Sequence, residues 1–309
     1  MEAIVTEGLT KSYSGHGLPV RRGAEVRALT DLNISVKPGE VFGFLGPNGA
    51  GKSTTIRLLL GYLHPTSGSA TVLGHDIVTD GLEIRRRTGY LPGGIALYDS
   101  MTGIEHLRYL ADLYGQAAPL RDDLIERLEL SRSDLGRQVR DYSRGMRQKI
   151  GIIQAFQHDP ELAILDEPSE GLDPLMQRSF YGIVEDRQRA GRTVFFSSHI
   201  LSEVERVCHR VAIVRKGELV ALNDITALLE RRRRSVDLRF EGPPPDLGAV
   251  AGVTDVVLLD GELTCQLEGD PGAFLRAIDG TEVRDLLIEP ARLEEAFMDY
   301  YATDAGESA

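Results

Sequence analysis

Short apolar runs separated by amphipathic stretches dominate the first 230 residues of the chain. Four of these runs, at residues 41–45, 162–165, 193–196 and 211–214, are nearly continuous in apolar residues, as is typical of strands buried on both faces. The stretches between them have the spacing of helices. Strands that alternate with helices predict an α/β domain built on a mostly parallel sheet.

The middle of this region has a different pattern. From residue 103 to residue 157 apolar side chains recur at helical spacing, with no strand pattern between them. The pattern predicts a helical subdomain, at about residues 95–158, inserted in the sheet domain. The positions that indicate it are Ile104, Leu107, Leu110, Tyr114, Leu124, Ile125 and Leu128.

The pattern changes again after a run of four arginines, residues 231–234. Cations near a helix C-terminus are favoured by the helix dipole, so we interpret this run as a solvated helix end rather than an anion-binding patch. A domain boundary is expected near residues 230–235, between the first domain at 1–230 and a small α+β accessory domain at 235–302. Strands are expected at 235–240, 254–259 and 263–267, helices at 271–278 and 291–301, and a disordered tail at 303–309.

Composition limits the possible partners. The 309 residues carry 35 Lys and Arg against 47 Asp and Glu, a net charge of −12, so the surface as a whole repels nucleic acid and any phosphate site must be local. Cys208 and Cys265 match no metal spacing and are expected to be reduced thiols of a cytosolic protein. No apolar run approaches the roughly 18 residues of a membrane span, so a membrane role would be that of a bound subunit.

A glycine-rich segment follows the first apolar run directly and precedes a helix expected at residues 55–62. It fits G-x-x-x-x-G-K-[ST], in which backbone N–H groups surround phosphates, the lysine reaches the β and γ oxygens, and the hydroxyl ligates Mg²⁺. A glycine-rich turn with no nucleotide is the alternative, and the Lys-Ser pair after the last glycine argues against it. The phosphate-binding candidates are Gly46, Pro47, Asn48, Gly49, Ala50, Gly51, Lys52, Ser53 and Thr54.

Two further segments supply polar groups at strand ends. Asp166 and Glu167 follow the apolar run at 162–165, which predicts Asp166, with Ser53, as a Mg²⁺ ligand and Glu167 as the base that activates water. His199 follows the run at 193–196, and it can donate to the γ-phosphate as negative charge moves during cleavage. A lone histidine after a strand is more often structural, so its role depends on the other two segments.

Together these segments resemble the ATP-binding cassette (ABC) ATPases over roughly residues 2–228. Residues 141–149, D-Y-S-R-G-M-R-Q-K, are similar to the signature sequence of that family, and Ser143 at the start of a helix, with the Gly145 N–H and the helix dipole, can form a second anion site. The resemblance implies that Ser143, Arg144, Gly145 and Met146 act on the ATP bound by a second copy of the chain. It therefore implies a head-to-tail dimer around two MgATP molecules.

The resemblance extends to three more positions. It implies that Tyr13 stacks on adenine, although a tyrosine closing an edge strand is a fair alternative, and that Asp173 couples the two sites of the dimer. Arg144 and Met146 depart from the signature, and Gly93 stands where the family has a glutamine or glutamate. Because Gly93 has no side chain to reach the metal, water is expected to complete the metal shell.

Within the family, the uninterrupted spacing of Ser-Arg-Gly-Met-Arg-Gln-Lys at 143–149, the Gly-Leu-Asp-Pro-Leu run at 171–175 and the C-terminal extension together resemble the drug and antibiotic exporter branch. That branch implies a separate membrane permease, here docking near residues 95–113, and a location at the cytoplasmic face of the membrane. A soluble ABC ATPase acting on ribosomes or DNA is the alternative, but the single phosphate loop and the negative charge argue against it. A P-loop GTPase would need Asn-Lys-x-Asp, which the sequence lacks. The transported compound and the direction of transport stay open.

Overall fold

The computed structural model describes residues 2–13, 26–115, 117–225, 233–248 and 250–289. The chain divides into two compact units, residues 1–222 and 223–309. The boundary therefore falls slightly before the expected 230–235, and residues 226–232 lie outside the described ranges.

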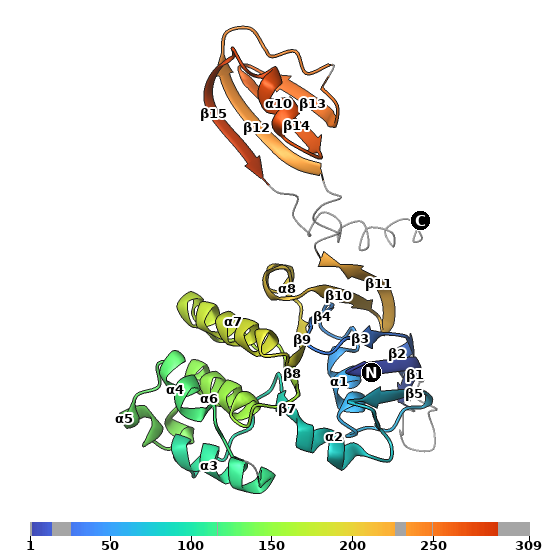
Figure 1. Ribbon diagram of the computed structural model, residues 1–309, viewed down its shortest axis with the longest axis vertical. Coiled ribbons are helices and arrows are strands. Elements are labelled where there is room, and N and C mark those ends of the chain that lie inside the picture. The colour runs from blue at the N-terminus through green and yellow to red at the C-terminus, as the bar shows by residue number, and fades with distance from the viewer. Residues whose placement is uncertain (1, 14–25, 116, 226–232, 249, 290–309) are drawn as a thin grey trace, which may run out of the picture. The chain divides into compact units, whose positions relative to one another are not determined.

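A six-stranded sheet forms the centre of the first unit, in the order β11-β10-β4-β9-β8-β7 (Figure 1). The pairs from β10 to β7 are parallel, which confirms the predicted α/β class with a mostly parallel sheet. All five residues of β4 and of β8 are buried, as their apolar runs indicated. The strands are β4 (Val41–Leu45), β7 (Thr88–Leu91), β8 (Leu162–Asp166), β9 (Thr193–Ser198), β10 (Arg210–Arg215) and β11 (Glu218–Asp224).

A second, antiparallel sheet was not predicted. Its order is β2-β1-β5-β6, with β3 also paired to β1, and its buried residues share one core with α1 and the six-stranded sheet. This sheet places β2 beside the phosphate loop. Its strands are β1 (Ile4–Tyr13), β2 (Val26–Leu32), β3 (Ser35–Val36), β5 (Ser67–Val72) and β6 (His75–Asp76).

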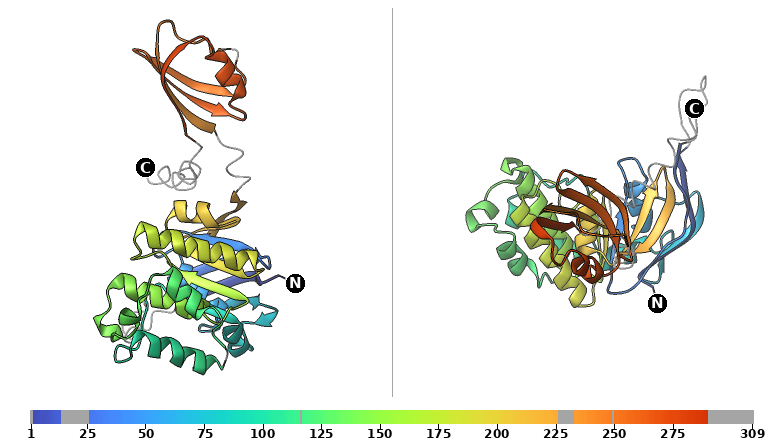
Figure 2. Two further views of the ribbon diagram at one scale, coloured as in Figure 1. Left: turned by 60° about the vertical axis from the view of Figure 1, so that its left-hand side comes forward. Right: turned by 90° about the horizontal axis from the view of Figure 1, so that it is seen from above.

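The predicted helical insertion is present, and no strand interrupts it within the described residues. Figures 1 and 2 show α3 to α6 grouped on one side of the six-stranded sheet. The helix α3 begins at a capping box, in which Thr102 Oγ1 accepts from Glu105 N at 3.3 Å and the Glu105 carboxylate accepts from Thr102 N at 2.8 Å. The insertion comprises α3 (Gly103–Tyr114), α4 (Arg121–Arg127), α5 (Arg132–Leu135), the 3₁₀ helix η1 (Val139–Asp141) and α6 (Arg144–Phe156).

The other helices of the first unit connect its strands. The helix after the phosphate loop begins at Lys52 rather than at the expected residue 55, because Gly51, with φ +102°, turns the chain directly into the helix. These helices are α1 (Lys52–Leu59), α2 (Gly81–Arg87), α7 (Pro174–Arg189) and α8 (Leu201–Val207). Among the described residues, no helix combines the length and the apolar character that crossing a bilayer requires.

The second unit is an antiparallel sheet, in the order β13-β14-β12-β15, with α10 packed on it through Phe274. The arginine run was interpreted wrongly as a helix end, because Arg233 and Arg234 belong to β12; residues 231–232 lie outside the described ranges. The strand β15 was missed. The expected helix at 291–301 and tail at 303–309 also lie outside the described residues. The elements are β12 (Arg233–Glu241), β13 (Val253–Leu259), β14 (Glu262–Glu268), α10 (Gly272–Ala277) and β15 (Glu282–Glu289).

Candidate active site

The phosphate loop runs from the end of β4 to the start of α1 and is fixed by contacts with three strands or strand ends. Gly46 N donates to Ser198 O at 3.3 Å, and Gly217 N donates to Ala50 O at 3.1 Å. A Cβ atom at Gly51 would lie 2.4 Å from Ala28 O of β2, so only glycine fits there. These contacts direct the first N–H groups of α1, which have no intrahelical acceptor, toward one cavity.

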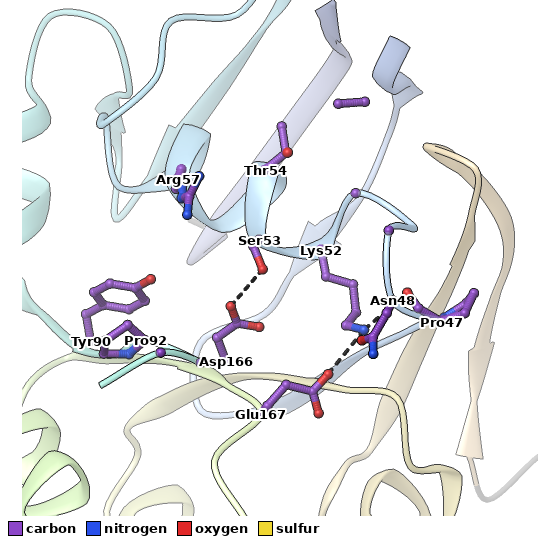
Figure 3. Close-up of a pocket in the computed structure, with 15 residues that line it drawn as sticks. Pro47, Asn48, Lys52, Ser53, Thr54, Arg57, Tyr90, Pro92, Asp166 and Glu167 are labelled. Carbon is purple, nitrogen blue, oxygen red and sulfur yellow. Dashed lines mark hydrogen bonds and ion pairs between the residues drawn. The ribbon is translucent and has the colours of Figure 1, made fainter. Parts of the chain in front are cut away.

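Lys52 is buried beneath this loop, with 6% of its surface exposed. Its Nζ donates to Gly46 O at 2.6 Å and to Pro47 O at 3.4 Å. The same ammonium lies 3.2 Å from Glu167 Oε1, as an ion pair rather than in directed hydrogen-bond geometry (Figure 3). A phosphate oxygen that reached Lys52 would therefore compete with Glu167 for its charge.

Asp166 ends β8 and is held by two hydroxyl groups. Ser53 Oγ donates to its Oδ2 at 2.9 Å, and Ser197 Oγ of the neighbouring strand β9 donates to its Oδ1 at 3.0 Å. Hydroxyl and carboxylate oxygens are ligands that Mg²⁺ prefers, and this ion commonly takes only one or two protein ligands alongside phosphates and water. One hydroxyl and one carboxylate therefore fit Mg²⁺ that arrives with a nucleotide, whose phosphates and water would supply the other ligands.

Glu167 and His199 meet beside Lys52. Glu167 has φ +51°, in the left-handed region that non-glycine residues seldom adopt, and its backbone N donates to Ser197 O at 3.0 Å. Its Oε2 lies 2.8 Å from His199 Nδ1. The carboxylate is thus held between a lysine and a histidine, and its Oε1 accepts no directed hydrogen bond from the described residues.

The cavity at this edge of the sheet has a volume of about 450 Å³, within the range of small-ligand sites (Figure 3). Seven of the nine predicted loop residues line it; Gly46 and Ala50 do not, because their N–H groups donate to Ser198 O and Pro47 O. Arg57 and Tyr90 also line the cavity and were not predicted. Arg57 could have been found, because it is four residues beyond Ser53 on the same helix. The lining residues are Ala28, Pro47, Asn48, Gly49, Gly51, Lys52, Ser53, Thr54, Arg57, Tyr90, Pro92, Gly93, Gly94, Asp166 and Glu167.

Tyr90 and Gly93 also line the cavity. Burial, followed by the charge of Asp166, raises the pKa of Tyr90 to about 12, so its hydroxyl stays protonated at neutral pH. A Cβ atom at Gly93 would lie 3.3 Å from Asp166 Oδ2. The glutamine or glutamate side chain that the family has in place of Gly93 would therefore lie directly beside Asp166, the predicted metal ligand.

The signature segment is not part of this cavity. Ser143 is exposed and is the N-cap of α6, where its Oγ accepts from Met146 N at 3.2 Å. Arg144 forms an ion pair with Glu170. The helix is also joined to the loop after Glu167, since Gln148 Nε2 donates to Pro168 O at 2.7 Å. Among the described residues of one chain, no contact brings Ser143 to the phosphate loop of that chain.

Two other predicted residues also lie outside the cavity. Tyr13 ends β1, pairs with Val26 and is 39% exposed; β1 lies between β2 and β5, so it is not the edge strand that was considered. Asp173 is the N-cap of α7, where its Oδ1 accepts from Leu175 N and Met176 N, both at 3.0 Å. Both roles assigned to these residues stay predictions. Cys208 and Cys265 are buried free thiols.

The family described as ABC transporter matches residues 29–170, from β2 through the signature helix into the loop after Glu167. The chain belongs to the ABC transporter family of ATP-binding proteins, and it is an ABC ATPase, as the resemblance predicted.

Individual relatives and one solved structure extend this comparison. The fluoroquinolones export ATP-binding protein of Mycobacterium tuberculosis is 38% identical, over 78% of this chain and 77% of its own. The bacitracin transport ATP-binding protein BcrA of Bacillus licheniformis is 36% identical, over 77% of this chain and 74% of its own. The solved structure of an ATP-binding subunit of an ABC transporter is 30% identical, with a TM-score of 0.64, and the match covers 73% of this chain and 91% of that one.

Proposed function

We propose that this chain is the ATP-hydrolysing subunit of a membrane exporter, that it dimerises head to tail around two MgATP molecules, and that dimer closure drives a separate permease. The observation that supports this most strongly is the convergence of Lys52, Asp166 and Glu167 on one cavity next to the phosphate loop, with His199 in contact with Glu167 from outside the cavity lining.

The charged and hydroxyl side chains of the site each have a chemical role in this proposal. Lys52 and the N–H groups of the loop bind the β- and γ-phosphates, and Ser53 with Asp166 would hold Mg²⁺, which neutralises charge on the phosphate oxygens. Glu167 accepts a proton from the attacking water. His199, fixed by its contact with Glu167, donates toward the γ-phosphate, so positioning and electrostatics supply most of the catalysis.

The exposed signature segment supports the dimer. A serine hydroxyl and the first N–H groups of a 13-residue helix form an anion site that faces solvent in one chain. In the proposed dimer, Ser143 and Gly145 bind the γ-phosphate held by the other copy, and Tyr13 stacks on adenine. Arg144 forms its ion pair with Glu170 of its own chain, so in this proposal its charge does not contact the partner's nucleotide.

A separate groove supports permease docking. Its volume is about 560 Å³, and it lies between the sheet domain and the helical insertion, with exposed apolar side chains on both sides. Of the residues that line it, only Leu110 and Leu113 belong to the predicted docking range 95–113; Tyr62, Leu82 and Arg85 extend the groove to the turn after α1 and to α2. An apolar groove with cations at its rim fits a short amphipathic cytoplasmic helix of the permease. The relatives named for bacitracin transport and fluoroquinolone export favour a drug or other hydrophobic compound as cargo.

Light scattering on the Glu167→Gln chain, with and without MgATP, tests the dimer. Removing the base should trap the closed form, so we expect a shift from monomer to dimer only with MgATP, and Ser143→Arg should abolish that shift. Ser131→Arg is the matched control, because Ser131 is also an exposed N-cap of the insertion but lies outside the signature. A shift that survives Ser143→Arg, or that is equally lost in Ser131→Arg, would contradict the proposed role of the signature.

A further inference from the structure

Glu203 is a buried carboxylate of α8 that does not line the nucleotide cavity. Only 6% of its surface is exposed, and each of its carboxylate oxygens accepts a hydrogen bond. Ser198 Oγ donates to Oε2 at 2.7 Å, and Ser169 Oγ donates to Oε1. Burying a carboxylate is costly unless its oxygens are satisfied, so these two hydroxyl groups explain how the charge is tolerated.

The two serines are close in sequence to Glu167 and His199. Ser169 comes two residues after Glu167, and Ser198 comes immediately before His199. Ser198 Oγ also accepts from Ile200 N at 2.9 Å, so the hydroxyl fixes the backbone on both sides of His199. A single carboxylate therefore joins the segment that follows the base to the segment that carries the histidine.

We propose that Glu203 is a positioning residue for ATP hydrolysis, which keeps Glu167 and His199 in register through its bridge between Ser169 and Ser198. The contact that it protects is the one at 2.8 Å between Glu167 Oε2 and His199 Nδ1. This inference rests on the catalytic roles proposed above for Glu167 and His199. Because none of its three residues lines the cavity, the bridge acts on the geometry of the reacting groups and not on nucleotide binding.

Three variants separate positioning from stability. Glu203→Gln keeps a two-point bridge, since an amide accepts from one hydroxyl and donates to the other. Glu203→Leu leaves two buried hydroxyl groups without their acceptor. The triple variant Glu203→Leu, Ser169→Ala and Ser198→Ala replaces the three bridging side chains by apolar groups, which leaves no hydroxyl group of the bridge without its acceptor. Because it also removes the acceptor of Ile200 N, Ser198→Ala alone is the control for that loss.

Phosphate release at varied MgATP gives kcat and KM for each variant. A displacement of about 1 Å in a reacting group can cost about 100-fold, so we expect kcat to fall roughly 10- to 100-fold in Glu203→Leu and in the triple variant. KM should stay within about threefold, because uniform binding is not affected. Glu203→Gln should retain most of the activity. Glu185→Gln, at an exposed pair with Arg189 on α7, is the control and should change neither constant.

The Glu167→Gln background provides the decisive comparison. If Glu203 acts through the base, Glu203→Leu should cause little further loss there, as for residues that act as a unit. A triple variant with unchanged kcat would overturn the proposal, and so would a rise in KM with kcat unchanged or an equal fold loss in both backgrounds. A Glu167→Gln chain with unchanged kcat would instead refute the assignment of Glu167 as the base. Glu203→Leu would then be measured in the His199→Ala background to test the bridge alone. If Glu203→Leu lowered kcat by the same factor with and without His199→Ala, the bridge would be refuted as well.

Discussion

The phosphate loop contains two glycines with left-handed backbones whose surroundings differ, and this difference permits a quantitative test. Gly51 has φ +102° and Gly49 has φ +82°. A Cβ atom at Gly51 would lie 2.4 Å from the backbone carbonyl oxygen of Ala28, whereas one at Gly49 would have no protein atom within 4 Å. Gly51→Ala and Gly49→Ala therefore share the backbone strain, and only the first adds a collision.

The magnitudes follow from these two terms. A left-handed conformation costs a non-glycine residue about 1–2 kcal/mol, and this term applies to both variants. Overpacking against surroundings that must move costs a further ~1–3 kcal/mol. This second term applies only to Gly51→Ala, because Ala28 O is a backbone atom of β2 and cannot rotate away. We expect Gly51→Ala to be less stable than Gly49→Ala by about 1–3 kcal/mol.

Urea unfolding of both variants without nucleotide measures this difference. Comparing two variants of the same chain cancels the contribution of the second unit, provided that the slopes of the transitions agree. Equal midpoints, or a lower midpoint for Gly49→Ala, would refute the idea that β2 restricts the loop. Calorimetric titration with MgATP in the Glu167→Gln background should then show the larger loss of affinity for Gly51→Ala.

Three other substitutions test separate parts of the description. Gly93→Gln should leave kcat and ATP affinity nearly unchanged in a phosphate-release assay if water completes the metal shell; a many-fold rise in kcat would show that the missing side chain limits hydrolysis. Asp173→Ala should lower the stability by about 0.5–2 kcal/mol in urea unfolding and Asp173→Asn by much less, because asparagine also caps helices; equal losses would contradict the cap. Burial lowers the pKa of His158 below its ordinary value of 6.5, so the unfolded chain binds a proton that the folded chain does not, and stability falls as pH drops below that value. We expect the urea midpoint to fall less between about pH 7.5 and about pH 5.5 in His158→Phe than in the unsubstituted chain. An equal fall in both chains would contradict the assignment.

The parts of the fold that could be predicted are those buried on both faces. The strands β4 and β8 are continuous apolar runs, so their sequence alone indicated them. The antiparallel sheet was missed because its burial does not follow apolar character; Thr6, for example, is buried in β1 with its hydroxyl donating to Leu32 O. The strand β15 was missed because six of its eight residues are charged or exposed, so it lacks an apolar run, and because its leucines come shortly before a proline.

The candidate site, like the fold, could be predicted only in part from the sequence. Motif spacing identified Lys52, Asp166 and Glu167, because strand ends of a parallel sheet meet at one edge. The contacts of Ser197 with Asp166 and of Ala28 with Gly51 depend on the order of strands and on a second sheet, which no local pattern specifies. Glu203 gave no signal in the sequence either, since an acidic residue on a short helix normally faces solvent.

The connection of α6 to the loop after Glu167 has a consequence for cooperativity. Gln148 holds Pro168 and Arg144 holds Glu170, so the helix that carries Ser143 and the loop that carries the base move together. In a head-to-tail dimer, ATP captured by Ser143 of one copy would thereby adjust the base of that same copy, which acts on the other nucleotide. The occupancy of each site would then control the turnover of its counterpart, and the rate would rise more steeply than in proportion to ATP concentration.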